Sequence, residues 1–126
     1  MTMKTRKIKI GIATPEQQRK RLMAIAKGEY TPKRGEPKIW FSSIESVSQV
    51  LSTKNQELLR LIIEMQPQSI SELAAETKRD QGNLSRTLKT FEKYGLLRMK
   101  KRGKAVVPET LATDFEVDFG LMPSIA

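Results

Sequence analysis

Apolar residues recur at helical spacing through the middle of this chain, and they alternate with polar residues near both ends. The helical recurrence predicts helices at residues 15–27, 44–51, 53–66, 70–77 and 81–94. The alternation predicts short strands at residues 6–14 and 115–119, and residues 39–41 form a strand or an entry segment. Two short apolar-containing runs, 96–101 and 105–108, flank Arg102-Gly103-Lys104 and predict a β-hairpin with a basic tip.

Polar residues at the expected helix starts support these boundaries. A Ser or Thr followed three residues later by Glu or Gln is typical of a capping box, which bonds the backbone N–H groups of the first helical turn. The pattern occurs at Thr14 and Gln17, at Ser42 and Glu45, and at Ser69 and Glu72. Asp80 is expected to cap the helix at 81–94, and Gly28 and Gly95 are expected to end two helices.

The helix expected at residues 53–66 has a narrow polar stripe, formed by Glu57, Arg60 and Glu64. A helix that is apolar on its other sides must be covered on more than one face. The N-terminal segment and a second subunit are the two candidates for that cover. The second candidate would make the protein a homodimer.

The helices expected at 70–77 and 81–94 are separated by a short polar turn, Lys78-Arg79-Asp80. In the second helix, Leu84, Leu88 and Phe91 share one face and are expected in the core. The opposite face carries Gly82, Arg86, Lys89, Thr90 and Lys93. Two helices joined by a short turn, the second with an outward basic face, are typical of the helix-turn-helix motif.

The 126-residue chain has 23 Lys and Arg against 14 Asp and Glu, a formal net charge of +9. Basic residues concentrate at 1–38 and 78–104, whereas 39–77 and 105–126 are net acidic. We divide the sequence into a basic N-terminal extension (1–38), a central domain (39–108) and an acidic-apolar C-terminal tail (109–126). A basic block alone can be a solvated face, but one that coincides with a nucleic-acid-binding motif indicates a nucleic-acid partner.

Cys and His are both absent, which excludes disulfides, thiolate nucleophiles and the zinc sites built on these residues. We find no nucleophile–base pair and no phosphate-binding glycine loop, so we expect no enzyme, no catalytic residues and no cofactor. Asp114, Glu116 and Asp118 lack the loop geometry of a hard-metal site, so we expect a solvated strand face and no metal. No apolar run reaches the ~20 residues of a membrane span. The absence of Cys favours the reducing cytoplasm.

Three motifs carry a resemblance to a known family: Ser69-Ile70-Ser71-Glu72-Leu73-Ala74, Asn83-Leu84-Ser85-Arg86-Thr87-Leu88-Lys89 and Glu92-Lys93-Tyr94-Gly95-Leu96-Leu97. With them, residues 53–108 resemble a winged helix-turn-helix domain of the multiple-antibiotic-resistance-regulator (MarR) type. Phe91 departs from the family pattern, where Leu is more usual. Phe41-Ser42-Ser43-Ile44-Glu45-Ser46 is similar to a segment that precedes the first domain helix in small antitoxin-like regulators. The resemblance implies a mainly α fold with a small β component (α+β), a winged helix-turn-helix with an N-terminal strand–helix extension.

The resemblance places the helix from Gln81 in the major groove of double-stranded DNA and the hairpin on the backbone or in the minor groove. The implied base contacts are Gln81, Asn83, Ser85 and Arg86. The implied phosphate contacts are Lys78, Arg79, Lys89, Lys93, Arg102 and Lys104. Asn83 could instead cap the helix, and the Arg86 and hairpin charges could be simply solvated. Trp40 is expected to be a packing anchor rather than a stacking platform.

The sequence thus predicts a sequence-specific DNA-binding transcription regulator, a homodimer by the habit of the family. The alternative is an antitoxin-like interaction protein, whose terminal segments bind a toxin-like protein partner while its centre autoregulates transcription. The tail strand, with Phe115, Val117 and Phe119 on one face, could pair across a subunit boundary or dock such a partner. A low aromatic content of 6% argues against a platform for single-stranded nucleic acid.

Overall fold

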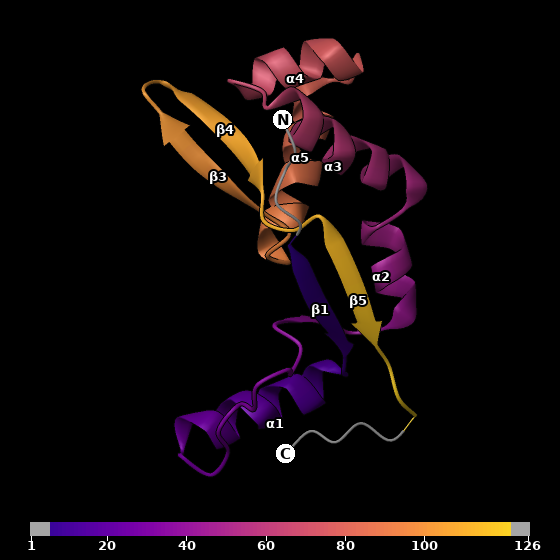
Figure 1. Ribbon diagram of the computed structural model, residues 1–126, viewed down its shortest axis with the longest axis vertical. Helices are drawn as coiled ribbons and strands as arrows, with labels where there is room; N and C mark the ends of the chain where they lie inside the picture. The colour runs from indigo at the N-terminus through magenta and orange to yellow at the C-terminus, as the bar shows by residue number, and fades with distance from the viewer. Residues whose placement is uncertain (1–5, 122–126) are drawn as a thin grey trace. The chain divides into compact units, whose positions relative to one another are not determined.

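The computed structural model describes residues 6–121, which form two compact units. The first unit takes in the chain up to Val47 and the segment from Asp114 onward, and the second is Ser48–Thr113. Strands β1 (Lys7–Ile12, indigo) and β5 (Asp114–Asp118, yellow) come from opposite ends of the chain and lie side by side (Figure 1). The N-terminal extension and the part of the C-terminal tail from Asp114 onward therefore share one structural unit.

The first unit is built on a three-stranded parallel sheet with the strand order β2-β1-β5. Helix α1 (Pro15–Ala26) connects β1 to β2 (Ile39–Phe41), a strand that the sequence-based division grouped with the central domain. The expected capping box is present, since the Gln17 N–H donates to Thr14 Oγ1 and the Thr14 N–H donates to Gln17 Oε1. The tail strand, which could have paired across a subunit boundary or docked a partner, pairs with β1 of its own chain.

Ile10, Ile39 and Phe41 form the buried part of this sheet. Gly11 is also buried, and a Cβ atom there would lie 2.5 Å from Cζ3 of Trp40. Glycine is therefore what lets the Trp40 ring pack directly on β1. Helix α1 carries no buried residue, and its Leu22 is 62% exposed.

Helix α2 (Ile44–Val50) begins at the expected residue, but its cap lies one residue later than expected. The capping residue is Ser43 rather than Ser42, and the expected box with Glu45 is wrong. The reason is a reciprocal pair of bonds, in which the Ser46 N–H donates to Ser43 Oγ and the Ser43 N–H donates to Ser46 Oγ. A short hydroxyl side chain at Ser46 closes the turn that Glu45 was expected to close.

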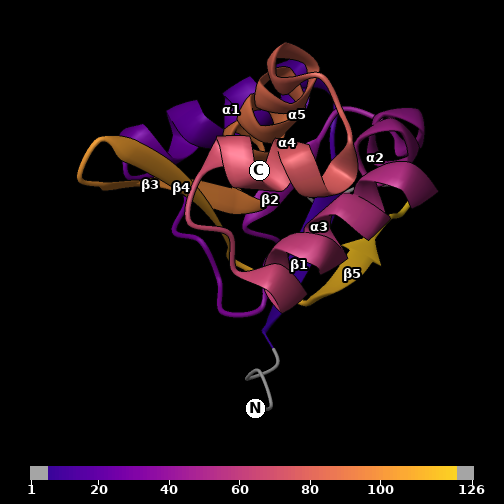
Figure 2. The same cartoon turned by 90° about the horizontal axis from the view of Figure 1, so that it is seen from above.

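The second unit contains three helices and a two-stranded antiparallel sheet, all of them predicted from the sequence. They are α3 (Thr53–Met65), α4 (Ile70–Thr77), α5 (Gln81–Lys93), β3 (Leu97–Arg102) and β4 (Ala105–Thr110). In the view of Figure 2, the β3–β4 hairpin reaches out to one side of α3 and α4. Strand β4 continues to Thr110, two residues beyond the expected end, because Leu97 pairs with Thr110.

Helix α3 packs against β4 of its own chain. Leu58, Leu59 and Ile62 are buried, whereas Leu61 and Ile63 are half-buried. The unit thus covers one face of this strongly apolar helix, and cover of the remainder by a second subunit stays a prediction. The five helices and five strands of residues 6–121 confirm the expected α+β class. None of these helices combines the length and the apolarity that a membrane-spanning segment requires.

Candidate nucleic-acid interface

Capping groups define the start and the end of α4 and the start of α5, and they thereby fix the turn between the two helices. The Glu72 N–H donates to Ser69 Oγ at 3.0 Å, which starts α4. Lys78 ends α4 in the left-handed conformation, with φ at 58°. The Asn83 N–H then donates to Asp80 Oδ2 at 3.0 Å, which starts α5. Asp80 is therefore the cap, as expected, and the alternative that Asn83 caps this helix is wrong.

Helix α5 separates its apolar and cationic residues onto opposite faces. Leu84, Leu88 and Phe91 are 0% exposed and belong to the core. All five residues expected on the opposite face are exposed: Gly82, Arg86, Lys89, Thr90 and Lys93. The buried side chains fix the rotation of α5 about its axis, so its cationic side faces solvent within the second unit.

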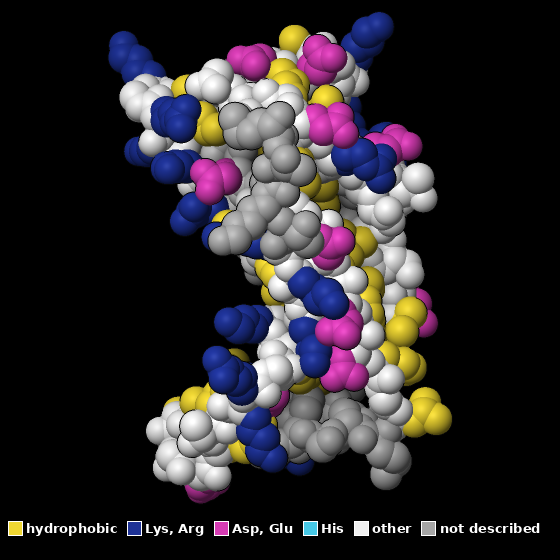
Figure 3. All heavy atoms as spheres, viewed as in Figure 1, with side chains coloured by type: hydrophobic (Ala, Val, Ile, Leu, Met, Phe, Trp, Pro, Cys, Tyr) yellow, Lys and Arg dark blue, Asp and Glu magenta, His cyan; other side chains and the backbone are white. Residues whose placement is uncertain are grey.

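The β3–β4 hairpin presents a second group of cations. Arg102 pairs with Ala105, so Gly103 and Lys104 form a two-residue turn. Gly103 has a φ of 60°, a conformation that suits Gly at the first position of a tight hairpin turn. Lys and Arg side chains gather over the hairpin, at the upper left of Figure 3. The sequence and the turn geometry together place charge at the far end of this hairpin.

Two polar contacts organise these hairpin side chains. Arg98 Nη2 donates to Glu109 Oε1 at 2.8 Å across the two strands. This hydrogen bond is the main reason that the pKa of Glu109 lies below its ordinary value, and the nearby positive charges act in the same direction. Arg102 Nη1 donates to Gln68 Oε1 at 3.3 Å, which links the hairpin to the loop before α4. Arg102 is therefore oriented by a neutral hydrogen-bond partner, and it forms no ion pair within residues 6–121.

The structure gathers eight of the ten predicted contact residues on α5 and the turn before it, and two at the hairpin tip. The predicted base contacts Gln81, Asn83 and Arg86 are exposed, and Ser85 is half-buried. Of the predicted phosphate contacts, only Arg79 is half-buried, and its backbone N–H donates to Thr77 Oγ1 at 3.3 Å. The exposed ones are Lys78, Lys89, Lys93, Arg102 and Lys104.

None of these ten residues forms an ion pair with an acidic side chain within residues 6–121. Lys93 has its ammonium 5.8 Å from the centre of the Tyr94 ring, a contact that leaves the charge in place. The candidate surface therefore carries positive charge that the described part of the protein does not neutralise.

Sequence reasoning missed three further exposed cations on β3, which are Arg98, Lys100 and Lys101. Arg98, Lys100 and Arg102 share one face of the hairpin because side chains alternate along a strand. The alternation of apolar and basic residues in Leu97-Arg98-Met99-Lys100 could have indicated this cationic face. The sequence analysis assigned nucleic-acid contacts only to Arg102 and Lys104 at the hairpin tip. The basic face therefore extends along β3 as well as around the turn.

The first unit holds a different cluster, in which Arg21 lies between Trp40 and Glu36. The Arg21 guanidinium lies 5.2 Å from the centre of the Trp40 ring and 3.7 Å from Glu36 Oε1. Glu36 also accepts from the Tyr30 hydroxyl at 2.6 Å and from the Lys33 N–H. The Tyr30 bond lowers the pKa of Glu36 and raises the pKa of Tyr30. Trp40 is thus a packing anchor in this cluster.

The acidic residues of β5 do not assemble a metal site. Across residues 6–121, no three carboxylates are grouped so that they could hold a metal ion. Asp114, Glu116 and Asp118 follow one another at every second position of a strand, which spreads them along its length.

The fold and this surface define a small α+β protein with an exposed cationic helix and hairpin. The chain belongs to the HVO_A0114 family, whose model matches residues 50–117. The match begins at the last residue of α2 and covers α3, α4, α5, the hairpin and most of β5. A comparison with curated proteins finds no match.

Proposed function

We propose that this protein is a sequence-specific DNA-binding transcription regulator of the winged helix-turn-helix class, similar to the MarR type. The order of α4, a three-residue turn, α5 and a hairpin supports this class. In the proposal, α5 is the recognition helix and the β3–β4 hairpin is the wing. A homodimer on a two-fold site would place two copies of α5 in major grooves about 34 Å apart.

The observation that carries the proposal is the exposed cationic face of α5. Arg86, Lys89 and Lys93 lie on the side opposite the fully buried Leu84 and Leu88. The major groove of B-DNA admits one α-helix, and a helix that enters it needs a polar face directed away from its own core. Residues near the start of α5 then approach the bases, while later cations approach the phosphates.

Arg86 is the residue most suited to direct base readout. Its side chain is exposed, and it has no acidic partner in the described part of the chain. A guanidinium donates two parallel hydrogen bonds to O6 and N7 of guanine, which is the commonest specific contact in protein–DNA complexes. Gln81 and Asn83, also exposed, offer amides that suit adenine in the same way.

The test begins with selection of bound sequences from a random duplex pool by the full-length protein. Arg86→Ala is then compared with wild type on the selected duplex and on a random duplex. We expect Arg86→Ala to weaken binding to the selected duplex by about 1–3 kcal/mol and to leave random duplex unaffected. Arg60→Ala is the matched control, because it removes another exposed arginine from α3.

Each outcome of this test bears on the proposal. Equal loss on both duplexes would make Arg86 a phosphate contact and remove it from base readout. Failure to select any sequence, or equal effects of Arg60→Ala and Arg86→Ala, would contradict specific recognition by α5.

A further inference from the structure

The exposed large apolar side chains of the described chain all belong to the first unit. They are Leu22, Met23, Ile44, Val117, Phe119 and Leu121, the last of which is 88% exposed. Three of them lie on β5 or directly after it. The second unit, which carries the proposed DNA-binding surface, contributes none, so this apolar surface needs a separate explanation.

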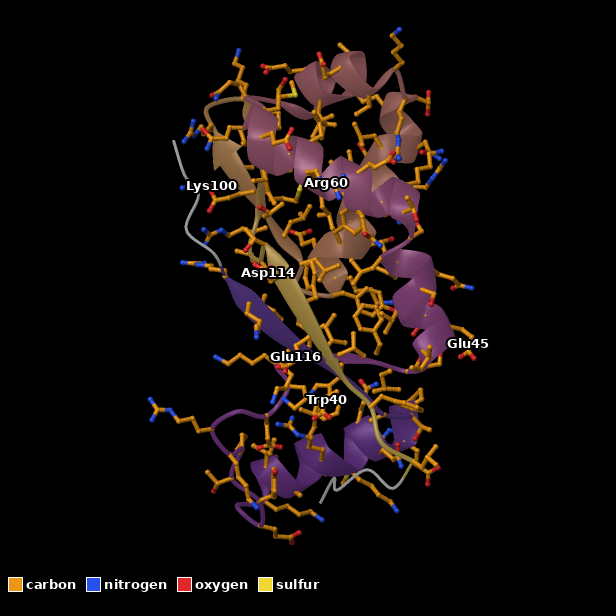
Figure 4. The ribbon with its side chains drawn as sticks, turned by 45° about the vertical axis from the view of Figure 1, so that its right-hand side comes forward. Trp40, Glu45, Arg60, Lys100, Asp114 and Glu116 are labelled. Atoms are coloured by element: carbon orange, nitrogen blue, oxygen red, sulfur yellow. The ribbon has the colours of Figure 1, made fainter. Side chains whose placement is uncertain are left out.

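Strand β5 presents two chemically different faces. Asp114, Glu116 and Asp118 are on one face, and Phe115 and Val117 are on the other. Asp114 and Glu116 are both labelled along β5 in Figure 4. All three acids are exposed, and Val117 is 45% exposed. Side chains above and below a strand can contact the side chains of a neighbouring strand at either edge. The acidic and the apolar face of β5 can therefore each contact a strand paired at its inner or its outer edge.

On its inner edge, β5 is matched by a strand with the complementary pattern. Lys7 lies beside Asp114 and Lys9 beside Glu116, while Ile8 lies beside Phe115 and Ile10 beside Val117. Cations thus neighbour acids on one face, and apolar residues neighbour apolar residues on the other. Opposite charges on adjacent strands stabilise a pairing, so β1 shows which kind of strand β5 accepts.

The outer edge of β5 has backbone groups directed away from the sheet. The Asp114 N–H donates to the Arg6 carbonyl at 3.0 Å, so the backbone of Asp114 faces β1. Because backbone direction alternates along a parallel strand, Glu116 also faces β1, whereas Phe115 and Val117 face outward. The strand order β2-β1-β5 leaves this edge unpaired within residues 6–121.

We propose that the outer edge of β5 is a docking site for a partner protein. The partner adds an extended segment with alternating cationic and apolar side chains as a further strand of the sheet. The outward N–H and C=O groups of Phe115 and Val117 supply main-chain hydrogen bonds, as in other cases of strand addition. The acidic face selects the partner's cations, and the apolar face of β5 receives its apolar side chains.

Charge argues for a cationic partner rather than a second copy at this edge. If β5 of a second copy continued the sheet with the apolar faces together, acids would lie opposite acids. Like charges directly opposite each other destabilise a strand pair. Acidic side chains on an exposed edge are also a recognised means of preventing association of identical strands.

The probe for the experiment is a synthetic peptide with the sequence of residues 6–12, RKIKIGI, which has the required alternation. Its binding to the full-length protein is measured by fluorescence anisotropy. The matched peptide carries Glu in place of its three cationic residues. We expect the cationic peptide to bind and the charge-reversed peptide to bind about tenfold more weakly.

Val117→Pro tests whether the outer edge is the site. Proline removes the outward N–H of Val117 but no N–H that faces β1, and such a position on an edge strand tolerates proline. We expect this variant to lose peptide binding about tenfold or more, while its circular dichroism and thermal midpoint stay close to wild type. Val117→Thr keeps the N–H and the β-branched shape, and it should retain binding.

The acidic face is tested with the double variant Glu116→Gln and Asp118→Asn. Both changes preserve side-chain size and remove two of the three negative charges on this face, so the preference for the cationic peptide should fall without loss of the fold. The proposal is overturned if the two peptides bind wild type equally, or if Val117→Pro binds like wild type. It is also overturned if the wild type sediments as a dimer and Val117→Pro as a monomer, since a second copy would then occupy the edge.

Discussion

Replacing Gly11 by alanine tests the packing that holds the first unit together. A Cβ atom at this position would lie 2.5 Å and 2.7 Å from two carbons of the Trp40 ring, and 2.8 Å from Cγ of Pro37. Carbon atoms that are not bonded attract most strongly at about 3.5–4.0 Å, so all three contacts are strongly repulsive. The ring, the proline or strand β1 must therefore move to accommodate one methyl group.

The magnitude follows from two opposing effects. Overpacking a filled site costs about 1–3 kcal/mol. Alanine restricts the unfolded chain more than glycine does, which returns about 0.4–1 kcal/mol. We therefore expect Gly11→Ala to lower the free energy of unfolding by about 1–2 kcal/mol. Movement of the Trp40 ring would also disturb its contact with Arg21.

The assay is urea unfolding followed by tryptophan fluorescence, because Trp40 is the only tryptophan in the chain. Gly120→Ala is the matched control, since a Cβ atom there meets no atom within 4 Å. In a Trp40→Leu background, followed by circular dichroism, the cost of Gly11→Ala should fall because the clashing ring atoms are gone. An unchanged unfolding midpoint for Gly11→Ala, or an equal cost in both backgrounds, would refute this account of the packing.

Three further predictions concern the second unit and the Glu36 cluster. Lys104→Ala should weaken binding to every duplex and reduce the slope of log K against log salt by about one, from a total near −5 for about six phosphate contacts. Lys54→Ala should leave the slope unchanged, and an equal effect would remove the hairpin tip from the interface. Asp80→Ala should destabilise the protein by about 1 kcal/mol in urea unfolding, because the Asn83 N–H loses its acceptor; an unchanged midpoint would show that this cap is dispensable. The pKa of Glu36 lies below its ordinary value of 4.5, so its stabilising effect is present above that pH and is lost as the pH falls through the lowered pKa. Tyr30→Phe should weaken this pH dependence in acid unfolding, and an unaltered profile would count against the Tyr30 bond as its main cause.

Much of the second unit could be predicted from local sequence. The periodicity of Leu84, Leu88 and Phe91 indicated both the helix and its buried face, and all three side chains are fully buried. Asp80 at the start of α5 and Gly103 in the hairpin turn also adopt the expected roles. Helices, caps and tight turns depend on residues a few positions apart, so their signals are contained in short stretches of sequence.

The sequence predicted the cations of the candidate interface that lie on helix α5. It missed several of those that lie on strand β3. Arg86, Lys89 and Lys93 were assigned to the outer face of α5, and each is exposed. Arg98 and Lys100 were overlooked, although they share a face with Arg102. The hydrogen bond from Arg102 to Gln68 joins residues 34 positions apart, and no local pattern indicates such a contact.

The sequence by itself determined the position of each helix to within about one residue and the apolar face of α5. It also determined that both ends of the chain alternate, with cations at the N-terminal end and acids at the C-terminal end. Only the tertiary structure decided that those ends pair, with Lys7 beside Asp114 and Lys9 beside Glu116 in one parallel sheet. The physical reason is that alternation defines the two faces of a strand but not its neighbour. The choice of neighbour depends on which segments the whole chain brings together, and here it leaves the outer edge of β5 unpaired within residues 6–121.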